Sequence, residues 1–433
     1  MGGGPGERGA GERAGAAARR IVSAQESGLV LVILLMVLGL TLYGAANPKP
    51  KNVGVRLGAG DQAVLIARTG AETPVGVPLA GELDRVEVRR AGAVVHRFAG
   101  ATDAHRWHIE ETPQNGGVPA RELKGRVEVN KFFEAGNLVL LANNASFVAV
   151  IAVGMTAVIV LAGIDLSVGS LYALAAVLTA MVVNKLDPSA PWWVSVPAAL
   201  VVSMLVGGAL GFANGAMIVG FRLHPFIITL GTMSVYRGIA FLATEGQTIG
   251  GLPDSLQTGF FKLAPFGGAG ETPVQPVNTA IMGVLAVVGT VVLGRTVFGR
   301  RVYAIGGNET AARYAGVPVG RVKLWVYTLV GVLTGLSACM YLGYYGAATS
   351  SAGTMLELRV IAAAVIGGAS LTGGRGTALG AVLGAIIIEL IANAISILNI
   401  DNAYLQVVTG GAIIVAVVID RVKRGFEARG RGA

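Results

Sequence analysis

The sequence contains few charged residues. Only 14% of its 433 residues are Asp, Glu, Lys or Arg, whereas a soluble globular domain carries about 25%. Hydrophobic residues make up 53%, and the mean hydropathy is +0.65. A chain with this composition turns most of its surface toward lipid, so the composition excludes an ordinary soluble domain and indicates a membrane protein.

Cysteine and nucleotide-binding motifs are also scarce. Cys339 is the single cysteine, so a disulfide within the chain is excluded, and its apolar surroundings predict a small core residue. The pattern Gly-x-x-x-x-Gly-Lys-Ser/Thr is absent, so the chain has no P-loop. Any ATP hydrolysis that drives this protein is therefore expected on another chain.

No set of catalytic residues stands out. Three of the four histidines, His96, His105 and His108, lie in one polar region, and His224 opens a hydrophobic run. The pair His105-x-x-His108 has no further ligand at a spacing typical of metal sites, which favours a solvated loop. We therefore expect no enzyme activity, no metal site and no cofactor.

The basic residues gather beside hydrophobic segments. The net charge is +9, and nine of the 34 basic residues lie in two blocks next to the first and last apolar runs. No aromatic residues alternate with them, as they would on a nucleic-acid-binding face. The pattern is that of the positive-inside rule and contacts with lipid headgroups, and we expect no nucleic-acid partner.

Two regions interrupt the membrane pattern near the N-terminus. Residues 1–27 are rich in Gly, Ala and Arg and are predicted to form a disordered cytoplasmic tail. The first transmembrane helix follows at 28–46, although Gly44-Ala45-Ala46 also resembles a signal-peptide cleavage site, which would remove this helix. From 48 to 131 charges are dense and apolar residues alternate, for example around a turn at Ala91-Gly92. This period of two predicts a small β-rich insertion.

The rest of the chain predicts an all-α polytopic membrane protein with about ten transmembrane helices. The transmembrane domain covers 138–420, contains a polar loop at 295–322, and is followed by a basic cytoplasmic tail at 421–433. After the helix at 28–46, the expected spans are 138–162, 167–184, 193–218, 225–244, 276–294, 323–345, 355–372, 377–397 and 403–420. Ten spans place both basic termini in the cytoplasm and the β-rich insertion outside it.

Small residues recur at four-residue spacing in two of these spans. Gly207, Gly211 and Gly215 form one row, and Gly376, Gly380 and Gly384 form another. Such rows allow helices to approach closely in membranes. Packing inside the bundle is favoured, with a dimer interface as the alternative.

One acid stands alone between two long apolar runs. Asp165 lies in the stretch Gly163-Ile-Asp-Leu-Ser-Val-Gly-Ser170, and neither flanking run carries a charge. A carboxylate at such a position is expected to face protein or water rather than lipid. Other charges in or near the spans form either a hydrophilic lining or internal ion pairs, and the sequence leaves both open. They are Arg237, Glu245, Glu357, Arg359, Glu389 and Asp420.

The polar loop holds a second informative pattern. Asn308 precedes Glu309-Thr310 and is a suitable N-cap for a short helix that runs to Tyr314, with Gly316 at its end. A short helix at the membrane surface can transmit force from a soluble partner into the bundle. A solvated interfacial helix is the simpler alternative.

Four segments together resemble a known family. They are Gly163–Ser170, the run Pro225-Phe-Ile-Ile-Thr-Leu-Gly-Thr-Met-Ser-Val-Tyr-Arg-Gly238, the stretch Ala304–Val317 and the segment Glu357–Gly376. In this order they resemble the ribose/xylose-type permease subunits of bacterial ABC sugar importers, over about 140–424. The resemblance implies a multi-pass protein of the bacterial inner membrane that imports a small sugar.

The resemblance also implies partners and site residues. Such permeases pair with a second copy or a paralogue, receive sugar from a periplasmic binding protein and are driven by a cytoplasmic ATPase. Carried over, the residues coupling to the ATPase are Gly306, Gly307, Asn308, Ala311, Ala312 and Gly316. The expected translocation pathway or gate contains Asp165, Ser167, Gly169, Ser170 and Glu389.

One region of the chain departs from that family, and two alternative functions are considered besides an ABC importer subunit. The insertion at 48–131 is longer than the family's connection there, so it modifies docking of the binding protein or is only a folded spacer. An ion-coupled secondary transporter that uses Asp165 and Glu389 is the main alternative. A membrane anchor for the insertion would leave most of the spans unexplained.

Overall fold

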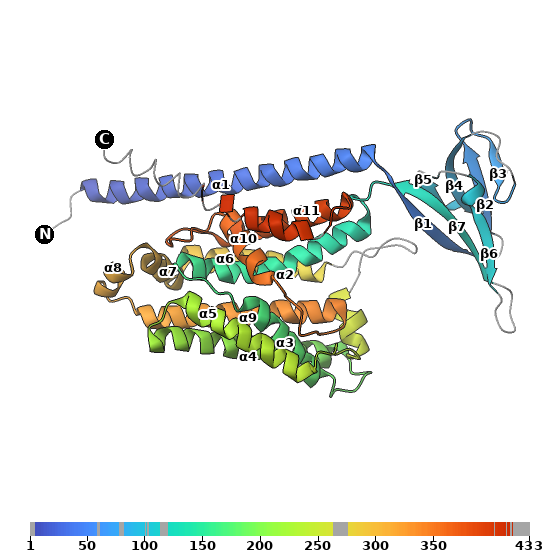
Figure 1. The fold of residues 1–433 in the computed structure, drawn as a ribbon. Helices are drawn as coiled ribbons and strands as arrows, with labels where there is room; N and C mark the ends of the chain where they lie inside the picture. Colours follow the sequence, from blue (N-terminus) through green and yellow to red (C-terminus); the bar gives the residue numbers. More distant parts are fainter. Residues whose placement is uncertain are drawn as a thin grey trace. The chain divides into compact units, whose positions relative to one another are not determined.

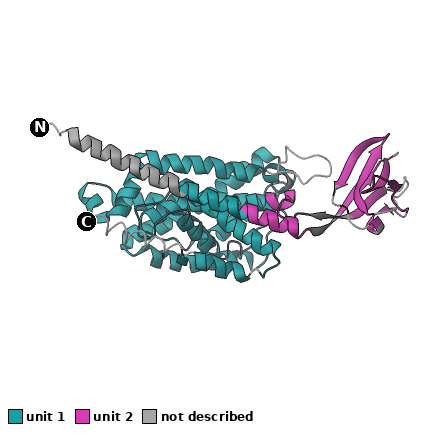
Figure 2. Ribbon diagram, turned by 90° about the horizontal axis from the view of Figure 1, so that it is seen from above, with its two compact units in different colours: residues 1–36, 139–266, 274–433 teal, residues 37–138, 267–273 magenta. Residues whose placement is uncertain are grey.

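The computed structural model describes residues 5–58, 61–77, 82–99, 101, 104–112, 120–262, 276–401, 403–412, 414, 415 and 418. The chain divides into two compact units, coloured separately in Figure 2: residues 37–138 with 267–273, and the remainder. The predicted basic tail, 421–433, lies outside the described residues. Each unit is built around a different kind of secondary structure.

Helices form the larger unit, and the first helix continues into the smaller one (Figure 1). They are α1 Pro5–Ala46, α2 Ala135–Val160, α3 Val168–Val183, α4 Trp192–Phe221, α5 Pro225–Thr244, α6 Val277–Arg295, α7 Val297–Gly307, α8 Glu309–Tyr314, α9 Val319–Tyr345, α10 Leu356–Ile366 and α11 Ala378–Ile397. Two short turns of helix occupy Ser255–Gly259 and Phe260–Lys262, and residues 403–412 are also helical.

Seven helices in the described part of the chain are long and apolar enough to cross a membrane: α2, α4, α5, α6, α9, α11 and the Glu26–Ala46 part of α1. The chain is therefore a mostly helical, multi-pass membrane protein. Two predicted spans are shorter than expected, since α3 has 16 residues and α10 has 11. The predicted span 355–372 is wrong in its second half. Gly368 and Gly373 adopt positive φ there and turn the chain out of the helix.

The predicted disordered tail at 1–27 also requires correction. Helix α1 begins at Pro5 and runs without interruption into the first span. Proline is well tolerated in the first turn of a helix, and the many Ala, Arg and Glu residues that follow have high helix propensity. The Gly-, Ala- and Arg-rich composition of this segment was therefore a poor guide to its backbone conformation.

Helices α4 and α9 approach each other through glycine. A side chain at Gly207 or Gly211 of α4 would collide with the backbone of α9 around Gly331, and one at Gly331 would collide with α4. Gly384 of α11 meets the Ala363 carbonyl of α10 in the same way. Both predicted glycine rows thus pack inside the bundle. Without a side chain in between, the two backbones can come into van der Waals contact.

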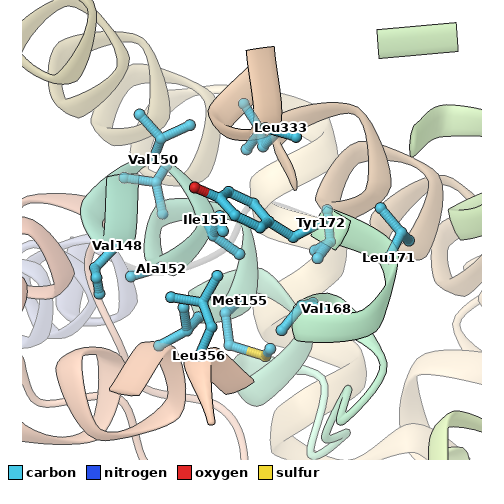
Figure 3. Packing of buried hydrophobic residues seen from close by; sticks show 14 of the residues in the cluster. Val148, Val150, Ile151, Ala152, Met155, Val168, Leu171, Tyr172, Leu333 and Leu356 are labelled. Carbon is cyan, nitrogen blue, oxygen red and sulfur yellow. The ribbon is translucent and has the colours of Figure 1, made fainter. Parts of the chain in front are cut away.

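The core of the larger unit lies where α2, α3, α9 and α10 meet. Figure 3 shows Ile151 and Met155 of α2 beside Tyr172 of α3, Leu333 of α9 and Leu356 of α10. Ile151 and Met155 are fully buried, and Tyr172 is 3% exposed. Helix α2 is apolar on all sides because it is enclosed by other helices, which is typical of the central helix of a bundle.

The smaller unit is a two-sheet β module, as the alternating pattern predicted. One sheet has the order β1-β7-β6 and the other the order β3-β2-β4-β5, with all strand pairs antiparallel. The strands are β1 Lys49–Leu57, β2 Asp61–Ala67, β3 Glu72–Pro74, β4 Leu83–Arg90, β5 Ala93–Ala99, β6 His108–Thr112 and β7 Ala120–Val129. The predicted turn at Ala91-Gly92 joins β4 to β5, and both residues have positive φ, as a tight two-residue hairpin requires.

Trp107 fills the centre of this module. Its ring is 2% exposed and lies 5.2 Å from the ring of Phe98, measured between centroids. Gly125 of β7 leaves the space that the indole occupies, because a Cβ there would overlap the ring. A small module of this size depends on one such large side chain to complete its core.

Candidate functional site

The lone acid of the sequence lies in a break between two helices. Helix α2 ends at Val160 and α3 begins at Val168, and the residues between them are not helical. Asp165 is 1% exposed. Its Oδ1 accepts hydrogen bonds from the backbone N–H of Ser167 (2.9 Å) and from the Ser167 hydroxyl (2.7 Å). The carboxylate therefore holds the turn that starts α3.

A chain of hydrogen bonds connects this turn to two other helices. Asn214 of α4 donates to the Ser167 hydroxyl at 2.8 Å, and Tyr236 of α5 donates to Asn214 Oδ1 at 2.9 Å. Thr229 of α5 also donates to the carbonyl of Ile164 at 3.3 Å. Buried polar groups in an apolar bundle are costly unless they are paired. This network therefore fixes α3, α4 and α5 relative to one another.

Gly169 and Ser170 belong to the same place. Both are buried in the first turn of α3. A side chain at Gly169 would collide with the carboxylate of Glu357 and with the carbonyl of Gly353, both from the segment around the start of α10. Four of the five predicted pathway residues are thus gathered where α3 begins.

The fifth predicted pathway residue lies elsewhere. Glu389 of α11 is 3% exposed and forms an ion pair with Arg359 of α10. Of the two alternatives that the sequence left open, the structure shows an internal ion pair for this acid. The pair connects α10 to α11. Removing one partner would leave an uncompensated buried charge and is therefore expected to destabilise this contact between the two helices.

The polar loop between α6 and α9 forms a pair of helices, α7 and α8. The hydroxyl oxygen of Thr296 accepts from the N–H of Gly299 at 3.1 Å and caps α7. Asn308 caps α8 as predicted, since its Oδ1 accepts from the N–H of Ala311 at 2.9 Å. Gly316 has a φ of +78°, and the N–H of Val317 donates to the carbonyl of Ala312. These bonds form a Schellman motif, so α8 begins and ends where the sequence indicated.

The predicted ATPase contacts divide into two groups. Exposed on the helix pair are Gly307, Asn308, Ala311 and Gly316. Ala312, by contrast, is 5% exposed, and Gly306 packs so closely on the carbonyl of Val160 and the N–H of Gly374 that no side chain fits there. This burial favours a packing role for Gly306 and Ala312, and a direct contact of either residue with an ATPase stays a prediction. When the residues of a family motif are assigned to this chain by resemblance, the assignment does not distinguish residues that pack on the bundle from residues that contact a partner.

One exposed residue was missed in the sequence. The ring of Tyr314 on α8 is 89% exposed, the highest value among the large hydrophobic side chains that the structure describes. It lies three residues after Ala311 and so shares a face of the helix with it. An aromatic residue inside a polar segment with a clear N-cap was the signal that could have identified it.

Glu309 joins α8 to the bundle. Its carboxylate lies 2.8 Å from Nζ of Lys323 on α9 and 3.1 Å from a guanidinium nitrogen of Arg313. The hydrogen bond from Lys323 is the main cause of a lowered pKa at Glu309. The acid therefore stays ionised at neutral pH and anchors the start of the helix.

The larger unit matches a described family. The family model for a branched-chain amino acid transport system, permease component, matches residues 137–417. The ribose import permease protein of Bacillus subtilis (strain 168) is 39% identical over 67% of this chain and 87% of its own length. The D-allose transport system permease protein of Escherichia coli (strain K12) is 35% identical over 69% of this chain and 87% of its own length.

A third relative extends the comparison. The L-arabinose ABC transporter permease protein of Azospirillum brasilense is 34% identical over 68% of this chain and 83% of its own length. No solved structure matches the chain. The matched residues contain both sites described above, whereas the β module at 49–129 lies before them. The chain thus belongs to this family of transport-system permeases, as the non-catalytic membrane component of an ABC importer.

Proposed function

We propose that this chain is the membrane-spanning subunit of an ATP-driven importer for a monosaccharide such as ribose, allose or arabinose. The named relatives carry those three sugars in their descriptions, and each is identical to this chain at 34% or more of the aligned positions. The ribose permeases among them have the higher identities. Which of these sugars the chain moves depends on the binding protein that delivers it as well as on the pathway.

The exposed helix pair α7–α8 is the observation that carries this proposal. Both helices are capped, and Gly306 locks α7 against the end of α2, so the pair is held rigidly. Ala311 and Tyr314 face outward from it. A rigid helix pair with an exposed aromatic anchor is suited to receive the motion of a partner, because aromatic residues dominate the energy of many protein interfaces. The partner is a cytoplasmic ATPase subunit.

The arrangement in the membrane follows from the same proposal. Counting α3, α10 and the helix that begins at residue 403 together with the seven long helices gives ten crossings. Ten crossings place both termini and the α7–α8 pair in the cytoplasm, with the β module on the periplasmic side of the bacterial inner membrane. There the module lies on the side where a sugar-binding protein docks. A second copy of the permease, or a paralogue, completes the pathway.

The hydrogen-bonded turn at Asp165 is proposed as part of the gate. Ser167 links that turn to α4 and, through Asn214, to α5. A change in the angle between these helices must break or exchange these bonds, so the network distinguishes one conformation from another. Gly169 acts there by allowing the start of α10 to pack closely, and Ser170 is buried beside it in the first turn of α3. Glu389 contributes through its ion pair with Arg359 rather than by contact with sugar.

Co-purification and uptake together test the function. The tagged chain is isolated from native membranes, and its partners are identified by mass spectrometry. The complex is then reconstituted with its binding protein, and uptake of radiolabelled D-ribose, D-allose and L-arabinose is measured with and without ATP. We expect an ATPase subunit in the complex and ATP-dependent uptake of one of these sugars. Uptake by the chain alone under an ion gradient would contradict the proposal.

A further inference from the structure

The segment between α9 and α10 has an unusual position for an irregular backbone. Residues 346–355 are not helical, and Gly346, Gly353 and Met355 have positive φ. They lead into α10, which is only 11 residues long. In a membrane, an irregular backbone is tolerated only where it is buried in protein or lines a water-filled cavity.

Arg237 shows how deep this segment lies. Its guanidinium Nη1 donates to the carbonyls of Ser350 (2.6 Å) and Ala352 (2.7 Å), and Nη2 donates to that of Gly353 (3.4 Å). Arg237 is seven residues before the end of α5, a helix of 20 residues. At about 1.5 Å per residue, it lies about 10 Å inside a helix that is about 30 Å long. With α5 crossing the hydrocarbon layer, the carbonyls that Arg237 binds lie within the reach of one Arg side chain from this level.

The starts of two helices meet at this depth. Gly353 and Glu357 contact Gly169 in the first turn of α3, and Leu356 of α10 joins the core beside α3 (Figure 3). Helix N-termini carry partial positive charge. The carboxylate of Glu357 thus lies against the first turn of α3 and within the first turn of its own helix, next to the segment that Arg237 holds.

Exposed polar side chains distinguish this place from a closed core. Ser351 and Thr354 are exposed, and Thr349, Glu357 and Arg237 are partly exposed. Three of the five N–H donors of Arg237 are used by the carbonyls described above. The hydroxyls of Ser351 and Thr354 already bind Thr349 and the Ser351 carbonyl inside the segment. The partly exposed charges of Glu357 and Arg237, in contrast, cannot face lipid without a large cost, so this place is expected to be wet.

We propose that residues 349–357, with Arg237, form a water-lined binding site for a neutral polyhydroxylated ligand part-way across the membrane. This inference rests on the proposed function and names a sugar subsite of its pathway. Ser351 and Thr354 supply hydroxyl groups, and the Glu357 carboxylate accepts hydrogen bonds from ligand hydroxyls. The two N–H donors of Arg237 that bind no carbonyl donate to ligand oxygens. Arg237 also positions the segment by binding its carbonyls.

Cysteine accessibility tests this site. The starting protein carries Cys339→Ala, so that no native cysteine can react with the reagent. Cys339 is the single cysteine and is fully buried, and alanine is a small apolar replacement for it. Ser351→Cys, Thr354→Cys and, as a further probe, Thr349→Cys are introduced one at a time. A membrane-impermeant quaternary-ammonium methanethiosulfonate reagent is applied to cells that express the complete transporter. Ile239→Cys is the matched control, since Ile239 is exposed on α5 two residues from Arg237. Lys185→Cys, exposed in the loop after α3, reports that the reagent is active.

We expect the reagent to modify the cysteines at 351 and 354 and to lower sugar uptake at least fivefold, while Ile239→Cys is neither modified nor inhibited. Modification at 185 without modification at 349, 351 and 354 would overturn the inference, because the segment would not face water. Modification there without loss of uptake would also overturn it, because the water would not belong to the pathway. The proposed function is tested separately by the uptake of the unmodified protein, which shows whether the importer works at all.

Discussion

The two units of this protein deal with charge in different ways. In the β module, the buried carboxylate of Glu87 receives hydrogen bonds from Arg85, Arg89 and Arg97, and Arg90 binds Asp61 twice. In the helical unit, Asp165 is bound by a serine and Arg237 by backbone carbonyls. Charged side chains in contact with water need little free energy to form clusters of ion pairs, whereas placing a charge in the lipid bilayer costs free energy. The helical unit therefore satisfies Asp165 and Arg237 with uncharged partners, and it pairs Glu389 with Arg359 across two helices.

The two units also differ in how their elements pack. The β module is closed around Trp107, a large side chain. The helical unit instead brings backbones together at positions where no side chain is present, such as Gly211 and Gly331. Small residues compensate for the weak hydrophobic drive between helices in lipid, because close approach increases van der Waals contact. The most sensitive positions are thus expected to be small residues in one unit and charged or aromatic residues in the other.

The largest effect is expected from Gly211→Val. The new side chain would collide with the Tyr327 carbonyl and with the backbone of Gly331, which we expect to cost about 3 kcal/mol or more. The variant should lose the monodisperse peak in size-exclusion chromatography and most of its uptake. Gly220→Val, on the same helix with open space around it, is the control. If Gly211→Val and Gly220→Val gave the same size-exclusion profile and the same uptake, α4 and α9 would not depend on glycine for their packing.

The next effect concerns Arg237→Lys. Lysine keeps the charge, but a single ammonium group cannot reproduce the fork that reaches three carbonyls. We expect uptake to fall about tenfold with little change in the amount of protein in the membrane. Quantitative immunoblotting of membranes alongside the uptake assay separates the two quantities. Uptake at the original rate would mean that charge alone, rather than the bonds to the 350–353 carbonyls, is what this position requires.

A pair of variants on α8 separates packing from contact. Ala312→Glu places a carboxylate in a buried position and should reduce the amount of folded permease. Ala311→Glu changes an exposed position and should leave the fold intact while abolishing recovery of the ATPase subunit in a pull-down. If both variants lowered the amount of folded permease, or if both only abolished recovery of the ATPase subunit, the distinction between a packing residue and a contact residue would be wrong. Tyr314→Ala should weaken the same association, by about tenfold or more.

The smallest effect is a pH dependence confined to the β module. The hydrogen bonds from Arg90 lower the pKa of Asp61 to about 2. Since the pKa is lowered by folding, this acid stabilises the module above its ordinary pKa of about 3.9, and the stabilisation is lost as the pH falls toward 2. Fluorescence of Trp107 follows urea unfolding of the module when the other three tryptophans are replaced by Phe. Arg90→Gln should reduce the shift of the urea midpoint between pH 5 and pH 2, and an unchanged shift would assign the pH dependence to other acids.

Much of this architecture could be predicted from the sequence. The β module was visible because period-two alternation and the Ala91-Gly92 turn are local signals. The short helix α8 was predicted at its cap, Asn308, and at its end, Gly316, because capping involves only neighbouring residues. The glycine rows were interpreted correctly as internal packing because spacing on a helix fixes which residues share a face.

The properties that the sequence left open or did not reveal depend on distant residues. The break after α10 depends on glycines at 367–376 that pack on α7 and α11, and an apolar run alone did not reveal it. The pairing of Glu389 with Arg359 and the carbonyl partners of Arg237 require elements far apart in the sequence. The orientation of Ala312 toward the bundle was likewise invisible in a motif that it shares with exposed neighbours.

The glycine contact between α4 and α9 also has a consequence for motion. Two helices whose backbones touch over several turns cannot slide or tilt against each other without opening voids, so they must travel together as one rigid body. Any alternation between outward and inward states has to be accommodated elsewhere, in non-helical segments whose side-chain hydrogen bonds can exchange partners. The break before α3 and the irregular stretch before α10 have that character, and they become the hinges around a fixed pair of helices.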